Sequence, residues 1–117
     1  MMKEETLRDI GEFECIHRIA HDLIYRPELV KLGTGDDGAV FMTPCGYDEV
    51  ISTDTMVEGI HFTKRTMSAA DTGYHLCAVN FSDMAAMGAE PVSFVISAAL
   101  PGDLSITWIE SLSLIHI

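Results

Sequence analysis

Basic residues are scarce in this chain. Its 117 residues include 7 Lys and Arg against 18 Asp and Glu, which gives a formal net charge of −11. Nucleic-acid binding depends on clustered basic side chains, and anionic membrane surfaces also attract basic segments. No stretch reaches the roughly 18 consecutive apolar residues of a membrane-spanning helix. We therefore expect neither nucleic acid nor a membrane among the partners.

Cysteine is sparse as well, and its spacing does not suit metal binding. Cys15, Cys45 and Cys77 are odd in number and form no C-x-x-C pair, which argues against a zinc site or a disulfide framework and for reduced thiols. The first residues are too acidic for a secretory signal. These features predict a cytoplasmic protein. A hydrophobic fraction of 48% over this length suits one domain with one core.

The common nucleotide-binding and hydrolase motifs are absent or incomplete. The sequence has no Walker A loop, no G-x-S-x-G elbow and none of the protein-kinase motifs V-A-I-K, H-R-D and D-F-G. Residues 33–38 match G-x-G-x-x-G, but a strand-like stretch follows them, whereas a dinucleotide fingerprint opens a helix. The adjacent carboxylates of Asp36 and Asp37 also suit a phosphate cradle poorly. A Rossmann or protein-kinase site is therefore disfavoured.

Hydrophobic periodicity predicts helices in three stretches. They span residues 5–25, 68–87 and 106–110. Ser68 and Asp71 form a capping box at the start of the second stretch, and Gly88 follows its end. Ser105 is placed to cap the third stretch.

Strand-like stretches separated by turns account for much of the remaining chain. They span residues 29–32, 39–42, 49–53 and 92–100. Turn chemistry at 44–48 predicts a hairpin between the second and third of these stretches. The last stretch is mostly apolar and bounded by prolines, as expected for a strand that is buried on both faces.

Acidic side chains recur beside the ends of the predicted elements or inside them. Asp36 and Asp37 follow the first strand-like stretch, Asp54 follows the third, and Asp83 lies within the largely apolar second helix. Carboxylates and hydroxyls that converge without basic residues need cations between them, and hard oxygen ligands suit Mg²⁺ or Ca²⁺. Because Mg²⁺ usually shares its coordination shell with substrate phosphates, an acidic chain can still bind a nucleotide. The alternative is that these residues are caps, turn residues and solvated charges.

One histidine and one basic pair follow the third acidic position. His61 comes directly after V-E-G-I at 57–60, where Glu58 is either its partner or a solvated charge, and Lys64 and Arg65 are adjacent. A lone histidine is more often structural than functional, and a basic pair is more often plain surface than an anion contact. Both interpretations stay open from the residues alone.

Three segments carry a family resemblance. They read G-D-D-G-A at 35–39, S-T-D-T-M-V-E-G-I-H-F at 52–62 and A-V-N-F-S-D-M-A-A-M-G-A at 78–89. With these segments in this order, residues 10–111 resemble the thiamine-monophosphate kinase family. That family belongs to an ATP-binding superfamily with aminoimidazole ribonucleotide synthetase, selenophosphate synthetase and a hydrogenase maturation factor. The departures are mild, since Phe81 and Met84 stand where Leu is common and Gly38 stands where Ala is common.

The resemblance implies a fold and a set of site residues. The fold is α+β, with a mixed or antiparallel β-sheet packed against helices as in the N-terminal domain of aminoimidazole ribonucleotide synthetase. His61 would contact the thiamine phosphate substrate. No side chain is assigned a catalytic role beyond metal binding. The implied magnesium ligands are Asp37, Ser52, Thr53, Asp54 and Asp83.

The resemblance also implies a reaction. Family members use ATP and Mg²⁺ to transfer the γ-phosphoryl group directly to thiamine monophosphate, which yields thiamine diphosphate. Phosphoryl transfer depends on charge neutralisation and in-line positioning more than on covalent chemistry. A carboxylate-held magnesium cluster would bring the two phosphate-bearing substrates together. The family further implies a homodimer.

Two parts of the family pattern are missing from this sequence. A G-G-D-T segment and a C-terminal α/β domain, which carry most of the expected ATP contacts, are not present. We expect residues 1–111 to form an N-terminal ATP- and magnesium-binding domain that is incomplete at its C-terminal end. Residues 112–117 carry no charge and no cap, and we expect them to be a non-native tail on a longer native protein. The chain alone should then have little or no turnover.

Two other functions compete with the kinase. One is a different ATP-dependent synthetase of the same superfamily, against which the V-E-G-x-H-F stretch argues. The other is a non-catalytic dimerisation or metal-binding module. Magnesium-dependent nucleotide binding separates this module from the enzymes, because a merely acidic surface does not need ATP to order its metal ions.

Overall fold

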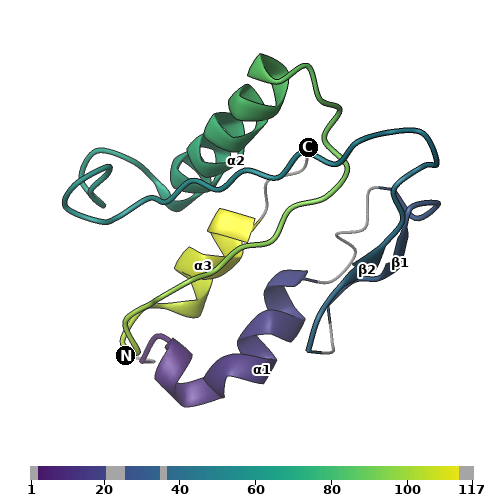
Figure 1. The fold of residues 1–117 in the computed structure, drawn as a ribbon. Helices are drawn as coiled ribbons and strands as arrows, with labels where there is room; N and C mark the ends of the chain where they lie inside the picture. Colours follow the sequence, from purple (N-terminus) through teal and green to yellow (C-terminus); the bar gives the residue numbers. More distant parts are fainter. Residues whose placement is uncertain (1–2, 21–25, 35–36, 114–117) are drawn as a thin grey trace.

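Three helices and a two-stranded sheet are the regular structure of the part of the chain that is described. The computed structural model describes residues 3–20, 26–34 and 37–113. Within these residues the elements are α1 (Leu7–Ala20), β1 (Val30–Leu32), β2 (Val40–Phe41), α2 (Ala69–Ala86) and α3 (Ile106–Ser113) (Figure 1). The α+β class is confirmed, with an antiparallel sheet that comprises only β1 and β2 among the described residues. None of the described helices combines the length and the apolar character that crossing a membrane requires.

The first helix begins at Leu7, two residues after its predicted start, and is divided by a glycine. Asp9 anchors its start, because the backbone N–H and the hydroxyl of Thr6 both donate to Asp9 Oδ2 at 2.9 Å. These hydrogen bonds lower the pKa of the Asp9 carboxyl. Gly11 has φ 78° and ψ 176°, a non-helical conformation that kinks α1. Residues 21–25 of the predicted helix lie outside the described residues.

The second helix begins and ends where its caps predict. The Ser68 hydroxyl accepts a hydrogen bond from the Asp71 backbone N–H at 3.1 Å, and the Ser68 backbone N–H donates to Asp71 Oδ2 at 3.2 Å. This reciprocal pair is the predicted capping box. At the other end, Gly88 takes φ +67°, a left-handed conformation that suits glycine. The local caps therefore set both ends of α2.

The capping box also gives α2 an acid-sensitive start. Hydrogen bonds from the Ser68 hydroxyl and then the Ser68 backbone N–H lower the pKa of the Asp71 carboxyl. A carboxyl whose pKa is lower in the folded state stabilises the fold above its unfolded pKa, about 4. That contribution is lost as the pH falls through the folded-state pKa.

Ser68→Ala should lower the free energy of unfolding by about 1 kcal/mol at neutral pH. The variant should also lose less stability than the wild type on acidification, because Asp71 then lacks the hydroxyl donor. Urea unfolding at a series of pH values measures both effects. The exposed Ser97→Ala is the matched control, and equal effects of the two substitutions would contradict the capping role.

The third helix is the centre of the helical packing. Helix α3 contacts both α1 and α2, whereas β1 and β2 contact only each other among the described elements. The buried apolar side chains here are Leu104, Ile106 and Ile109. Ser105 caps α3 as predicted, since its hydroxyl accepts a hydrogen bond from the Trp108 backbone N–H at 3.2 Å. The helix continues to Ser113, three residues beyond the predicted 106–110.

The N-terminal segment is fastened to the segment that leads into α3. Leu7 N–H donates to the Leu104 carbonyl at 3.0 Å, and Ile106 N–H donates to the Glu5 carbonyl at 3.0 Å. Thr6 and Ser105 form an isolated antiparallel bridge between these donors. Because these bonds join residues 5–7 to residues 104–106, α1 and α3 begin side by side (Figure 1).

The predicted hairpin is wrong in its pairing. Strand β2 pairs antiparallel with β1, with Val30 opposite Phe41 and Leu32 opposite Val40. The predicted turn at 44–48 does form, because Tyr47 N–H donates to the Pro44 carbonyl at 3.3 Å. Residues 49–53, the expected partner of 39–42, are not a strand. The chain therefore pairs 39–42 backward with the preceding stretch and not forward across the turn.

The apolar run at 92–100 is also not a strand in the structure, contrary to its prediction. A strand needs a neighbour for its backbone hydrogen bonds and a cover for its apolar faces. No described segment pairs with this run, and its Val95 side chain is 87% exposed. One contact joins it to α2, where the rings of Phe81 and Phe94 meet edge to face at 6.3 Å between centroids. The prediction of a strand buried on both faces is therefore wrong in its pairing and in its burial.

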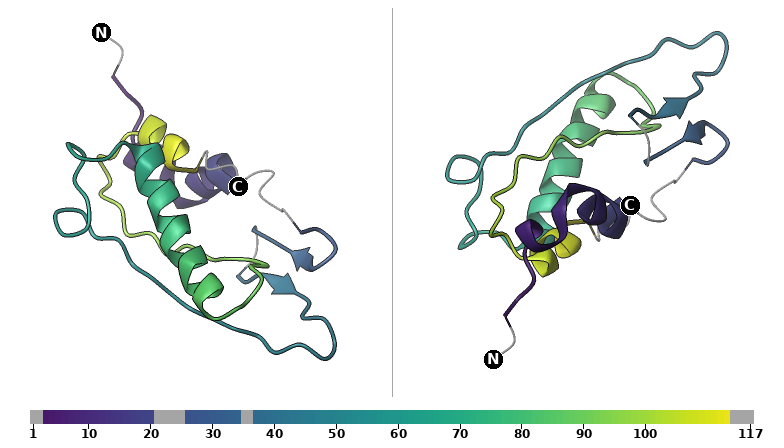
Figure 2. Two further views of the ribbon diagram at one scale, coloured as in Figure 1. Left: turned by 90° about the horizontal axis from the view of Figure 1, so that it is seen from above. Right: turned by 90° about the horizontal axis from the view of Figure 1, so that it is seen from below.

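Two long segments without helix or strand lie beside the helices. Figure 2 shows residues 42–57 and 89–104 running along α2 in both views. The radius of gyration is 15.8 Å, against about 13 Å for a compact chain of this length. Ile51, on the first segment, is 79% exposed. The segments thus leave apolar surface uncovered.

Candidate functional site

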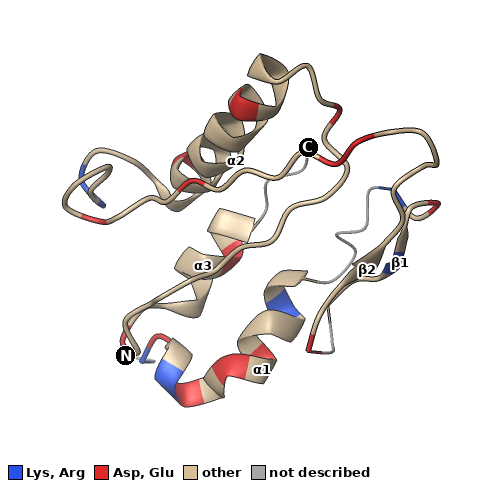
Figure 3. Cartoon of the chain, viewed as in Figure 1, with Lys and Arg blue, Asp and Glu red and all other residues tan. Residues whose placement is uncertain are grey.

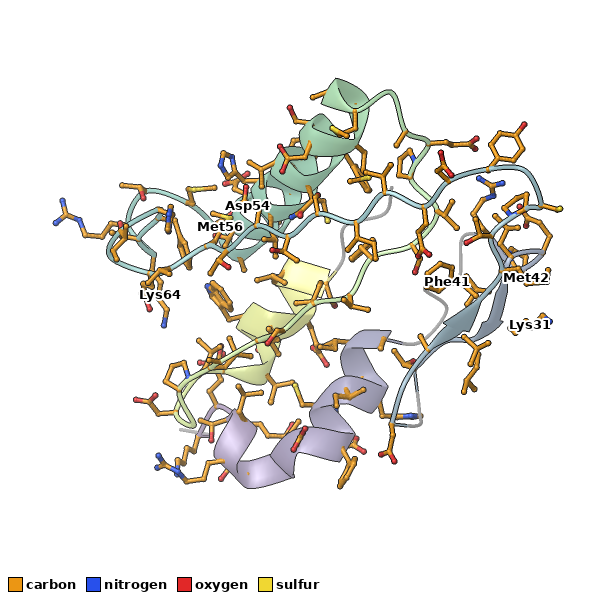
Figure 4. All side chains as sticks on the ribbon, viewed as in Figure 1. Lys31, Phe41, Met42, Asp54, Met56 and Lys64 are labelled. Carbon is orange, nitrogen blue, oxygen red and sulfur yellow. The ribbon has the colours of Figure 1, made fainter. Side chains whose placement is uncertain are left out.

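The five candidate magnesium ligands are distributed over separate parts of the fold. Asp37 lies on the connection between β1 and β2, and Asp83 lies in α2 near its C-terminal end. Ser52, Thr53 and Asp54 lie on the extended segment between β2 and α2, where Figure 4 labels Asp54. All five side chains are exposed. The predicted ligand Asp37 is described, whereas its neighbour Asp36 lies outside the described residues.

Local hydrogen bonds orient some of these residues. Asp54 Oδ1 accepts a hydrogen bond from the Thr55 backbone N–H at 2.7 Å, and the residue is exposed. One turn before Asp83, the Asn80 amide donates to the Leu76 carbonyl at 2.8 Å. This bond ties the polar side chain of Asn80 back to its own helix. The Asp83 carboxylate has no hydrogen bond or ion pair among the described contacts.

These residues do not converge into a preformed metal centre within the described chain. No group of three or more His, Cys, Asp or Glu side chains is arranged to hold a metal ion among the described residues. Figure 3 shows the acidic residues spread over α1, α2 and the connecting segments. Their chemistry nevertheless fits magnesium, because exposed carboxylates and hydroxyls are hard oxygen donors. The described residues therefore include suitable oxygen donors, but the structure does not bring these donors together around one metal position.

His61 is part of a tight turn and does not pair with Glu58. The Val57 backbone N–H donates to His61 Nδ1 at 2.9 Å. The His61 backbone N–H donates in return to the Val57 carbonyl, also at 2.9 Å. Of the two interpretations of Glu58, the structure thus fits the solvated charge and not the partner of His61. His61 is an exposed residue, and Nδ1 is the ring nitrogen that this hydrogen bond occupies.

Gly59 gives this turn its shape. It takes φ +83°, and its N–H donates to the Phe62 carbonyl at 2.7 Å. Nothing lies within 4 Å of a Cβ added at this position. A side chain here would therefore strain the backbone without a clash.

Gly59→Ala should lower the free energy of unfolding by about 1 kcal/mol through backbone strain alone. Gly38→Ala is the matched control, because that position is equally open and has no left-handed φ. It should be neutral or slightly stabilising. Urea unfolding of both variants makes the comparison, and a neutral Gly59→Ala would contradict the left-handed turn.

A basic side chain connects the loop after this turn to α3. Lys64 Nζ lies 5.9 Å from the centroid of the Trp108 ring, within range of a cation–π contact. Figure 4 shows Lys64 on this loop, at the opposite end of the molecule from Lys31 and Phe41 on the sheet and from Met42 directly after it. Lys64 thus has a structural contact, while Arg65 is exposed.

Two partners at the site were missed by sequence reasoning. The amide of Val57 is a backbone donor, and such donors leave no mark in the sequence. Trp108 lies far from Lys64 along the chain, so no local pattern connects them. Two of the thiols are buried, and this burial raises the pKa of Cys15 and of Cys77, which disfavours their reactive thiolate form.

Comparison with known proteins identifies the class of this domain. Residues 35–114 match the family described as AIR synthase related protein, N-terminal domain. This match covers more than half of the chain, and the chain belongs to that family.

Three curated relatives of this chain share one name. It is 41% identical over 102 residues to the thiamine-monophosphate kinase of Bacillus subtilis, covering 87% of this chain and 30% of that protein. It is 41% identical over 109 residues to the Haemophilus influenzae protein of the same name, covering 92% and 33%. The Escherichia coli K12 protein of that name is 43% identical over 104 residues, covering 88% and 31%. The chain thus spans about a third of the length of these relatives. No solved structure gives a significant match.

Proposed function

We propose that this chain is the N-terminal part of a kinase that uses ATP to phosphorylate thiamine monophosphate. A terminal phosphate oxygen of thiamine monophosphate would form a bond to the γ-phosphorus of ATP. The bond between that phosphorus and the β,γ-bridging oxygen would break, so that ADP leaves and thiamine diphosphate forms. The similarity to three thiamine-monophosphate kinases over 102 to 109 of the 117 residues carries this proposal.

Magnesium is the cofactor of this proposal. Its ligands would come from Asp37, Ser52, Thr53, Asp54 and Asp83. Bound magnesium would neutralise charge on the phosphate groups of both substrates. The exposure of all five side chains supports this assignment, because each can reach a ligand without rearrangement of a core. The carboxylates would converge only in the assembled enzyme with its nucleotide.

The proposed enzyme needs more than this chain. Most ATP contacts would lie in the two thirds of the relatives that the chain does not cover. We propose a cytoplasmic homodimer as the working form. The apolar run at 92–100 is exposed in the single chain, and this supports the proposal that another protein surface covers it in the complete enzyme. The 117-residue chain alone should have little or no turnover. We also propose that residues 112–117 are a non-native tail.

The experiment is an assay of the complete gene product with ATP, Mg²⁺ and thiamine monophosphate. Formation of thiamine diphosphate and ADP in equal amounts supports the kinase. ATP turnover that needs an amide or selenide acceptor instead would favour a synthetase of the same superfamily. Magnesium binding without any ATP-dependent product would favour the non-catalytic module. Chelation of Mg²⁺ should abolish turnover and its addition should restore it.

A further inference from the structure

The turn at 57–62 is closed twice by the same pair of residues. Val57 N–H donates to His61 Nδ1 and the Val57 carbonyl accepts from His61 N–H, both at 2.9 Å. The Val57 carbonyl also accepts from Ile60 N–H at 3.1 Å, and Gly59 N–H donates to the Phe62 carbonyl at 2.7 Å. The imidazole is therefore a structural member of the turn as well as an exposed side chain.

This arrangement determines which ring nitrogen carries the proton. A nitrogen that accepts a hydrogen bond presents a lone pair, so Nδ1 is unprotonated here. The neutral ring then has its proton on Nε2. We propose that the Val57 amide is the positioning group that holds His61 as an outward-facing Nε2–H donor. Val57 acts through the ring and is not itself a catalytic residue.

The loop around this donor is held at several points. Thr63 N–H donates to Thr66 Oγ1 at 3.1 Å, and the Thr66 hydroxyl donates to the Thr63 carbonyl at 3.0 Å. Lys64 packs over Trp108 of α3. Two residues after Thr66, Ser68 begins the capping box of α2. The donor is thus mounted on a loop that is connected to both α2 and α3.

A single fixed N–H donor recognises a hydrogen-bond acceptor of complementary geometry, and an anionic oxygen gives the stronger bond. This step rests on the proposed function, in which the anionic oxygen belongs to the phosphate group of thiamine monophosphate. The side chain of His61 would then contact the acceptor substrate and not the nucleotide. Positioning of the ring before binding would lower the entropic cost of that contact.

The hydrogen bond is tested by nitrogen NMR of the complete gene product in mildly alkaline buffer, where unperturbed imidazoles are neutral. We expect a scalar coupling between the Val57 amide nitrogen and His61 Nδ1, with the proton on Nε2. Exchange of the Val57 amide proton should accelerate about two- to tenfold in His61→Gln, which lacks an acceptor near Nδ1. In His61→Asn the side-chain oxygen lies near the Nδ1 position, so protection should largely remain. Absence of the coupling, or equal protection in both variants, would overturn the positioning role.

The donor role is tested by kinetics with the same two variants. His61→Asn keeps the turn but lacks the Nε2 donor, so KM for thiamine monophosphate should rise about tenfold while KM for ATP stays constant. His75→Asn, at an exposed position of α2, is the matched control and should change neither constant. An unchanged KM for thiamine monophosphate in an otherwise active His61→Asn enzyme would overturn the donor role and leave the kinase assignment intact. A wild-type enzyme without thiamine monophosphate phosphorylation would overturn the proposed function, while the NMR result for the Val57 hydrogen bond would still stand.

Discussion

Asp83→Asn should reduce the turnover of the complete gene product by at least about 100-fold while leaving its fold intact. The substitution keeps the size of the side chain and removes its charge, so a magnesium ligand would be weakened without a change in packing. The residue is exposed on α2, and its carboxylate has no hydrogen bond or ion pair among the described contacts. Its loss should therefore cost little stability.

Two measurements separate this effect from unfolding. Circular dichroism and urea unfolding should be unchanged in Asp83→Asn, whereas kcat with saturating ATP and Mg²⁺ should fall. The exposed Asp103→Asn is the matched control and should retain full turnover. If Asp83→Asn turns over like the control, Asp83 is a solvated helix residue and not a magnesium ligand.

Both ends of α2 and the start of α3 were predictable, because each depends on residues only a few positions apart. Ser68 and Asp71 close the capping box within one turn, and Gly88 provides the left-handed residue that ends the helix. Ser105 caps α3 through the amide three residues later. Capping interactions of this kind depend only on neighbouring residues, so the local sequence is enough to predict them.

The strands were less predictable because a strand depends on a partner that the local sequence does not name. The run at 92–100 has the apolar content of a buried strand, yet no described segment pairs with it. In α1 the same limit appears on a smaller scale. Phe13 is apolar and lies in the first of the predicted helices, but it is exposed, while Cys15 is buried. Periodicity predicts which side chains are apolar, and tertiary contacts decide which of them are covered.

The candidate site combines a part that the local sequence predicts with a part that depends on tertiary packing. The motif at 52–62 placed His61 and Asp54 on one stretch of chain, and the structure keeps them on connected segments between β2 and α2. Convergence with Asp37 and Asp83 depends on how distant elements pack, and the described residues do not bring these carboxylates together. The partner of His61 was also unpredictable, because any residue at position 57 supplies the same backbone amide except proline.

The packing of α3 leads to the prediction with the largest effect on stability. Ile109 is 3% exposed and lies in the helix that contacts both α1 and α2. Ile109→Ala removes buried methyl and methylene groups and leaves a cavity, which should lower the free energy of unfolding by about 3 kcal/mol. Few side chains share this burial among the described residues, so little else in the core can compensate for the loss.

Urea unfolding followed by the fluorescence of Trp108, the single tryptophan of the chain, measures this loss directly beside the mutated position. Ile51→Ala makes the same chemical change at a side chain that is 79% exposed, and it should shift stability by no more than about 0.5 kcal/mol. The contrast depends only on burial, because residue type and substitution are identical. Equal losses at the two positions would mean that α3 is not the centre of the core, and that the segment at 49–53 is covered as completely as the helix.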